Sequence, residues 1–210
     1  MKSFSIGGFT ALYEFDANGY ATKRTDSITG DYLLISASGS LLTKQNYDAA
    51  GAATGLPKYS VINAEGLILR EVNFDTIFFT YNSQGQMIKS TNGSGAHVTG
   101  WTIYNWADEN VTSTITYNGG GSITRTSNFD YYTNKLNKGG INFIYGFLTD
   151  ARYGKTIKNL IRQIEDSDGT SVSTSSFSYT FDSNGYLANI SSLYQPANTL
   201  VSADLTYACN

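Results

Sequence analysis

The chain repeats one short pattern, in which an Asp, Asn or Ser is followed three residues later by Gly. The clearest copies lie in YEFDANGYATKR at residues 13–24 and YTFDSNGYLANI at 179–190. Eight copies can be counted: Asp16/Gly19, Ser36/Gly39, Asp48/Gly51, Asn63/Gly66, Asn82/Gly85, Asn118/Gly121, Asp166/Gly169 and Asp182/Gly185. In such a turn the Asp or Asn side chain accepts backbone hydrogen bonds, and Gly takes the left-handed conformation that starts a bulged return strand. The pattern therefore predicts a series of β-hairpins.

The segments between the turns alternate between two kinds of side chain. Along 111–118, 177–182 and 201–209, apolar or aromatic residues mostly alternate with Ser, Thr, Asn or Asp, as expected of strands with one buried face. About a dozen such strands can be counted, and an antiparallel sheet of that width is expected to curl or close. We therefore predict an all-β fold, a single antiparallel up-and-down meander curled into a barrel or half-barrel, with residues 1–210 as one domain.

Alternation leaves open which way the apolar face points. A soluble barrel turns this face inward, whereas an outer-membrane barrel turns it toward lipid. Many of the predicted strands are shorter than the roughly 9 to 11 residues that cross a bilayer. We expect the soluble form and keep the outer-membrane barrel as the alternative.

Composition narrows the classes of partner. A net charge of −3 and a pI near 5.1 argue against a nucleic-acid binder, because such proteins need a basic surface to replace the counterions of phosphates. Cys209 is the sole cysteine of the sequence, so no disulfide or cysteine-based metal centre can form within one chain. The start, MKSFSIGGFT, lacks the apolar run of a secretory signal. Two alternatives follow, a cytosolic protein or a chain that begins after a removed signal.

One stretch, 133–160, breaks the repeat. Apolar residues of 141–151 recur at helical spacing and Gly154 is placed as a C-cap, which predicts one short helix near 141–152. Six basic residues gather around it: Lys135, Lys138, Arg152, Lys155, Lys158 and Arg162. We interpret 133–160 as an irregular or helical lid or plug at one barrel end with a solvated basic rim. A contact for an anion or polyanion is the alternative.

The repeat units YEFDANGYATKR, FTYNSQGQMIKS and YTFDSNGYLANI resemble the YD-type repeats of Rhs-like bacterial surface proteins. The tail, from FDYYTNKLNKGGINF through GKTIKNLIRQIEDSDG to FSYTFDSNGYLANI, is similar to a family of lipoprotein domains from Gram-negative gut bacteria, described as having a porin-like fold. This resemblance is best over about residues 110–210. It implies a precursor with a signal, a lipid anchor in the periplasm or at the outer-membrane surface, a barrel-like sheet and no known activity. The lipoprotein cysteine is missing from the start of this chain, so the anchor rests on the resemblance.

Motifs that carry chemistry are sparse. His97 is the only histidine of the sequence, which rules out a His-rich metal site. The Gly-Ser-Gly at 93–95 precedes a predicted strand, whereas a phosphate loop precedes a helix N-terminus. The carboxylates of 165–168 match a hairpin turn better than a calcium loop, which carries a downstream Glu. We expect no catalytic residue, no metal site and no cofactor.

The best candidate contact surface is aromatic. Its members lie in WTIYNWADEN and FDYY and are Trp101, Tyr104, Trp106, Tyr131 and Tyr132. Trp101 has the opposite parity to Tyr104 and Trp106 along a strand, so it is expected on the other face. Aromatic rings stack on sugars but also build cores, and core packing is the alternative.

These observations lead us to expect a non-enzymatic cell-envelope barrel, secreted or lipid-anchored, that binds a glycan, a peptide or an envelope protein, or serves a structural role. The alternative is a hydrolase with an acidic pair that no motif marks, since such a pair must face across the substrate. An exposed cluster around Tyr104 and Trp106 would favour binding. Two carboxylates across a closed pocket would favour hydrolysis.

Overall fold

A computed structural model describes residues 2–6, 9–18, 20–72, 75–94, 97–138 and 151–207 of the chain. These residues form sixteen strands and one short 3-10 helix, η1. The strands are β1 (Lys2–Ile6), β2 (Phe9–Phe15), β3 (Ala21–Asp26), β4 (Tyr32–Ser38), β5 (Leu41–Tyr47), β6 (Ala53–Ile62), β7 (Ile68–Val72), β8 (Thr76–Tyr81), β9 (Met87–Ser94), β10 (His97–Ala107), β11 (Asn110–Asn118), β12 (Ile123–Leu136), β13 (Asn159–Ser167), β14 (Val172–Phe181), β15 (Leu187–Gln195) and β16 (Thr199–Tyr207). The helix η1 spans Ala151–Tyr153.

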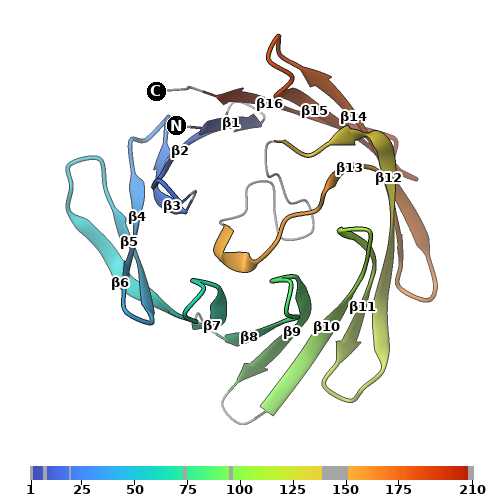
Figure 1. The fold of residues 1–210 in the computed structure, drawn as a ribbon, viewed down its shortest axis with the longest axis horizontal. Helices are drawn as coiled ribbons and strands as arrows, with labels where there is room; N and C mark the ends of the chain where they lie inside the picture. Colours follow the sequence, from blue (N-terminus) through green and yellow to red (C-terminus); the bar gives the residue numbers. More distant parts are fainter. Residues whose placement is uncertain are drawn as a thin grey trace.

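The sheet closes on itself. Each strand pairs antiparallel with the next along the chain, and β1 pairs with β16, from Lys2 opposite Tyr207 to Ile6 opposite Ala203. Figure 1 shows the resulting ring, with the first and last strands side by side. Closure removes both sheet edges, whose unpaired backbone groups would otherwise invite aggregation. The predicted all-β, up-and-down meander is confirmed, with more strands than the dozen expected.

Six of the expected turns have the predicted geometry. They begin at Asp16, Asp48, Asn63, Asn82, Asn118 and Asp182. In each, the side-chain Oδ1 accepts a hydrogen bond from the backbone N–H four residues on, at 2.8–3.1 Å. Their glycines, such as Gly85, Gly121 and Gly185, have φ between 74° and 87°, the left-handed region that side chains disfavour. Gly19 lies outside the described residues.

The other two turns lie elsewhere. Ser36 is inside β4, and its hairpin turns at Gly39 and Ser40, because Ser38 pairs with Leu41. Likewise, Asp166 lies within β13. The turn that follows β13 is made by Asp168, whose Oδ1 accepts hydrogen bonds from the backbone N–H groups of residues 170 and 171, each at 2.8 Å. The motif alone misplaced these turns because the strand register, and not the Gly spacing, decides where a hairpin ends.

Apolar side chains of the strands, together with Ile157 of the β12–β13 connection, form three buried clusters. The members are Leu42, Ile62 and Ile68 in the first, Val111, Ile157 and Ile161 in the second, and Leu160, Tyr179, Leu187, Ile190, Ala203 and Leu205 in the third. Burial of this apolar surface is the main favourable contribution to folding. The apolar face of the barrel therefore points inward at these positions.

The outer face of β12 to β16 is mostly polar. Its exposed polar side chains include Asn128, Asp130, Glu165, Ser176, Ser178, Thr180, Ser202 and Asp204, and Ile123 and Leu200 are exposed apolar side chains on the same face. A membrane barrel instead carries an apolar band around its outside. In the described part of the chain, we find no helix with the length and apolarity to cross a membrane.

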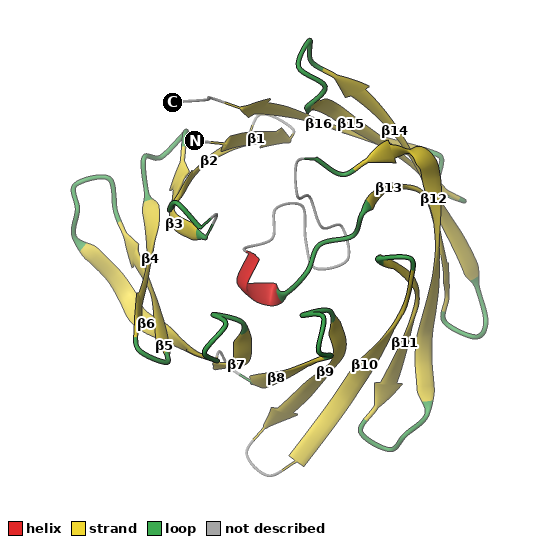
Figure 2. Ribbon diagram, in the orientation of Figure 1, coloured by secondary structure: helices red, strands yellow, loops and turns green. Residues whose placement is uncertain are grey.

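In the described part of the connection between β12 and β13, η1 lies inside the ring of strands (Figure 2). The helix expected near 141–152 falls largely outside the described residues. Residues 151–158 pack against hairpins at one barrel end, which we call the plug end. There the backbone N–H of Lys155 donates to the carbonyl of Gly85 at 2.8 Å, and that of Lys158 to the carbonyl of Glu109 at 3.1 Å. We call the other end, which carries the turns at 48–52, 118–122 and 168–171, the cavity end.

Buried polar contacts fasten η1 to the wall. The Tyr153 hydroxyl donates to Glu71 Oε2 at 2.7 Å, and Lys44 Nζ lies 2.8 Å from Glu71 Oε1. Arg152 is buried and donates to the carbonyl of Ala21 at 3.0 Å. These bonds satisfy charges that would be costly to bury alone.

The basic residues of this segment are largely paired. Glu109 binds both Lys155 and Lys158, at 2.5 and 3.3 Å. Asp130 binds Arg162, and Lys135 lies 4.0 Å from the centre of the Tyr132 ring. Arg152 is buried, and Lys138 Nζ lies beside the turn at Gly185.

We expect Asp182→Ala to lower the free energy of unfolding by about 1 to 2 kcal/mol, because Asp182 Oδ1 accepts the N–H groups of Asn184 and Tyr186 at 2.9 and 2.8 Å. Urea denaturation measures this loss. Ser183→Ala in the same turn is the control. Equal stability of the two variants would contradict the assigned role of Asp182.

A second prediction concerns pH. Burial opposes ionisation of Glu71, but the charges of Lys44 and Lys58 and the hydrogen bonds from Lys44 and Tyr153 outweigh it and lower its pKa. The stability this carboxylate contributes is present above its unfolded pKa, about 4.3. It is lost as the pH falls through the lower pKa of the folded chain.

Thermal unfolding at several pH values tests this. We expect Glu71→Gln to lower the Tm at neutral pH, and the gap from the unmodified chain to narrow below about pH 4. The control is Glu14→Gln, which removes an exposed pair with Lys23 at 3.7 Å and should have little effect at any pH. A gap for Glu71→Gln that stays constant with pH would rule out the linkage.

Candidate functional site

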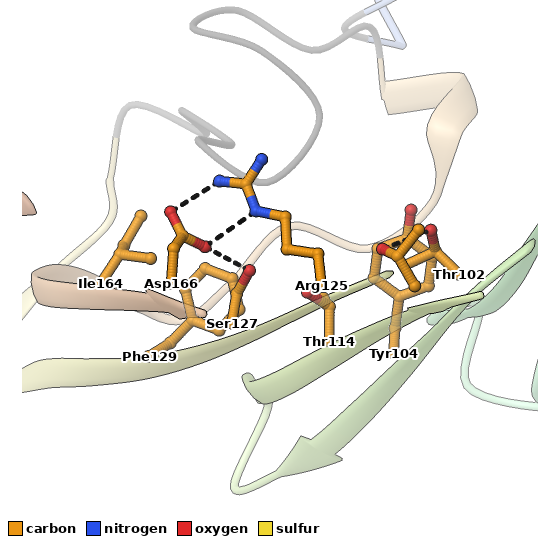
Figure 3. A pocket seen from close by; sticks show the side chains of 9 residues that line it. Thr102, Tyr104, Thr114, Arg125, Ser127, Phe129, Ile164 and Asp166 are labelled. Carbon is orange, nitrogen blue, oxygen red and sulfur yellow. Dashed lines mark hydrogen bonds and ion pairs between the residues drawn. The ribbon is translucent and has the colours of Figure 1, made fainter. Parts of the chain in front are cut away.

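Toward the cavity end, part of the inner wall is polar instead of apolar. A cavity of about 260 Å³ is lined there by Thr102, Tyr104, Thr114, Thr116, Arg125, Ser127, Phe129, Ile164 and Asp166. Strand pairing assembles this wall from β10 to β13: Tyr104 lies opposite Thr114, which lies opposite Ser127, which in turn lies opposite Asp166. Phe129 and Ile164 pack against the buried cluster of Val111, Ile157 and Ile161. The cavity therefore lies on the inner face. We call it the first cavity (Figure 3).

An ion pair borders the first cavity. Arg125 binds Asp166 through two contacts, Nε to Oδ1 at 3.2 Å and Nη2 to Oδ2 at 2.6 Å, and Ser127 Oγ donates to Asp166 Oδ1 at 2.5 Å (Figure 3). The hydrogen bond to Asp166 raises the pKa of Arg125, more than partial burial lowers it. A guanidinium has five N–H donors, and Asp166 accepts two of them, so Arg125 retains donors for a ligand.

Hydroxyl groups line much of the remaining wall. Thr102 Oγ1 and Thr116 Oγ1 are 3.1 Å apart, and the Tyr104 hydroxyl is 3.1 Å from Ser90 Oγ. Burial raises the pKa of Tyr104 despite its bond to Ser90, so the phenol stays protonated at neutral pH. The wall thus offers several groups that can both donate and accept hydrogen bonds.

A second cavity, of about 450 Å³, adjoins the first. Arg125 and Asp166 line both cavities, and the second is completed by Ser167, Asp168, Ser171, Val172, Ser173, Tyr194 and Pro196. Tyr194 is 42% exposed and shares the inward parity of buried Ile190 on β15. A side-chain hydrogen bond from Thr170, with backbone N–H groups of residues 170 and 171, lowers the pKa of Asp168 to about 2. Asp168 is therefore ionised at neutral pH.

The predicted aromatic residues divide between the two faces. Trp101 stacks outside on Tyr117, with ring centres 5.0 Å apart. Inside, Tyr104 lines the first cavity, whereas Trp106 donates through Nε1 to the carbonyl of Met87 at 2.8 Å and packs on the core.

Tyr131 and Tyr132 belong to the packed interior. Their hydroxyls donate to the carbonyls of Val111 at 2.6 Å and Phe177 at 3.0 Å. Both rings pack against buried clusters. The opposite parity of Trp101 and Tyr104 therefore holds, but the five aromatic residues form no single contact surface.

The remaining sequence candidates lie apart. His97 is exposed at the start of β10, Glu165 faces outward, and Asp168 is held in its turn. Among the described residues no group of three His, Cys, Asp or Glu side chains could hold a metal ion. Cys209 lies outside the described residues.

Sequence analysis did not single out Arg125 or the lining threonines. Alternation marks them as hydroxylic or charged positions in strands, but such residues are usually on the outside of a soluble barrel. Their inward direction depends on the register of β10 to β13, which includes bulges within β10/β11 and β11/β12. The signal that could have revealed the site is that Arg125, Ser127 and Phe129 share one face of β12, on which polar side chains precede an aromatic one.

Comparisons with known proteins agree on the fold. A porin-like protein from Bacteroides uniformis ATCC 8492 superposes with a TM-score of 0.71 at 12% identity, over 98% of this chain and 94% of that one. A porin-like protein from Bacteroides vulgatus ATCC 8482 gives 0.57 at 13% identity, over 99% and 98%. No family model and no curated protein matches the sequence. At such identities the likeness establishes a porin-like β fold shared with proteins of gut bacteria.

The two tryptophans should differ sharply on replacement. We expect Trp106→Ala to cost about 3 kcal/mol of unfolding free energy, because it leaves a cavity beside the core and removes the bond to Met87. Trp101→Ala should cost about 1 kcal/mol, the value of a half-buried aromatic pair outside the core. Chemical denaturation of both variants measures the difference, and a larger loss for Trp101→Ala would contradict the assigned faces.

Proposed function

We propose that this protein is a non-enzymatic cell-envelope barrel that binds a glycan at its cavity end. The observation that carries the proposal is the hydroxyl-lined first cavity, whose lining also includes the Phe129 and Tyr104 rings and the Arg125 guanidinium. Sugars are recognised by hydrogen bonds that both donate and accept, combined with aromatic faces. Ligand sites are concave and contain few well-placed polar groups.

An envelope location rests on two lines of support. The structural neighbours are porin-like proteins from two Bacteroides species, and the repeat units resemble those of bacterial surface proteins and lipoprotein domains. The mostly polar outer face of β12 to β16 favours a barrel that works in an aqueous compartment, held at the membrane by a lipid anchor, over one embedded in lipid.

The carboxylates near the cavities favour binding over hydrolysis. A glycosidase needs a protonated acid and a second carboxyl group across the bond to be cleaved. Asp166 accepts from Arg125 and Ser127, and Asp168, with its pKa of about 2, cannot supply a proton at neutral pH. Another cavity, of about 260 Å³, is also lined by two carboxylates, Asp26 and Asp31. Both accept backbone hydrogen bonds from turns, which gives them a structural role.

A glycan array followed by calorimetry on the purified chain tests the proposal. We expect a saccharide to bind, and the double variant Tyr104→Phe/Thr114→Val to weaken its affinity at least about tenfold, because each hydroxyl is worth about 1 kcal/mol. Both replacements keep the shape of the side chain, so the fold should persist.

The matched control is Thr126→Val/Asn128→Ala, which removes polar groups from the outer face of β12. Saccharide binding should be unchanged in this control, and circular dichroism should confirm that both double variants are folded. Failure of every saccharide to bind, or equal losses in both variants, would refute glycan binding at the first cavity.

A further inference from the structure

The two cavities that meet at the Arg125–Asp166 pair carry a more specific inference, which rests on the proposed function. Each cavity uses a different part of the pair's surroundings: β10 to β13 for the first, and the β13–β14 hairpin with β15 for the second. The shared pair places the two cavities next to each other, the first on the inner wall and the second at the rim of the cavity end, around the β13–β14 hairpin. The site is therefore elongated.

The first cavity is small for a complete ligand site. Small-molecule sites in proteins usually enclose about 300 to 1,000 Å³, and this cavity encloses about 260 Å³. The adjoining 450 Å³ brings the site into that range. A ligand that fills the site must extend past Arg125 and Asp166.

The second cavity repeats the chemistry of the first. Ser167, Ser171 and Ser173 supply hydroxyls, and the half-exposed Tyr194 supplies an aromatic ring. A chain of similar units would find similar contacts on both sides of the ion pair.

The charges of the site sum to a negative value. Asp166 matches the charge of Arg125 within hydrogen-bond distance, and Asp168 adds a carboxylate that is ionised at neutral pH. Asp168 is exposed at the rim of the second cavity, so it repels like charges most strongly at low ionic strength, where screening is weak. An anionic ligand is therefore disfavoured.

We propose that the site takes a neutral oligosaccharide that spans both cavities, with one end against Tyr104 and Thr114 and the other against Tyr194. The Arg125–Asp166 pair contacts the ligand where it passes from one cavity into the other. Affinity should increase with chain length until both cavities are filled.

Calorimetry with neutral oligomers of one to six units, from glucan, xylan and mannan series, tests this inference. In at least one series we expect affinity to rise about tenfold or more between one unit and six. Galacturonate oligomers of the same lengths should bind about tenfold more weakly than the best neutral series at low ionic strength, and less so as salt screens the charges.

Tyr194→Ala should reduce the ratio of affinities for six units and one unit to near one, since a single unit seated in the first cavity does not reach Tyr194. Leu200→Ala, which replaces an exposed side chain on the outer face of β16, is the control and should keep the full ratio. Far-ultraviolet circular dichroism of both variants establishes that they are folded.

The outcomes separate the two proposals. Equal affinity for one and six units in every series, or a full length gain in Tyr194→Ala, overturns the two-cavity inference and leaves glycan binding intact. Tighter binding of galacturonate oligomers overturns the neutral ligand class. If no saccharide binds, both this inference and the proposed function are refuted.

Discussion

Closure of the backbone hydrogen-bond ladder is the constraint on which the rest of this structure depends. Pairing of β1 with β16 leaves no open edge. Because barrel diameter grows with the number of strands, a closed sheet of sixteen strands is wide. A barrel of about eight strands is filled by its own side chains, whereas one of sixteen to eighteen leaves a channel. The chain therefore needs material other than wall side chains inside the ring, and part of it comes from the β12–β13 connection.

The interior is divided as a result. At the plug end, residues 151–158 bring Ile157 to Val111 and Ile161, and Tyr153 to Glu71, so that apolar and charged groups are buried together. Toward the cavity end the wall side chains are short hydroxyls that do not fill the space, and cavities remain on both sides of the Arg125–Asp166 pair. The packing that stabilises the barrel and the candidate binding site thus lie in different parts of the same interior.

Local patterns predicted the local structure well. Asp182 with Gly185 and Asn82 with Gly85 form the expected turns because their hydrogen bonds involve residues at most four apart. The pattern misplaced the turn at Asp166, where a competing interaction with Arg125, 41 residues away, uses the same carboxylate. It also missed the β10–β11 hairpin, in which Asp108 and Glu109 take positive φ values of 49° and 65° without a glycine.

The sequence by itself determined the hairpins, the alternation of the strands, the all-β class and the opposite faces of Trp101 and Tyr104, because each depends on neighbours along the chain. Tertiary structure decided that the sheet closes, that Trp106 belongs to the core, and that Arg125, Ser127 and Asp166 meet inside the barrel. These outcomes depend on strand register and on contacts between residues tens of positions apart, and a one-residue shift of register would turn each of these side chains to the other face.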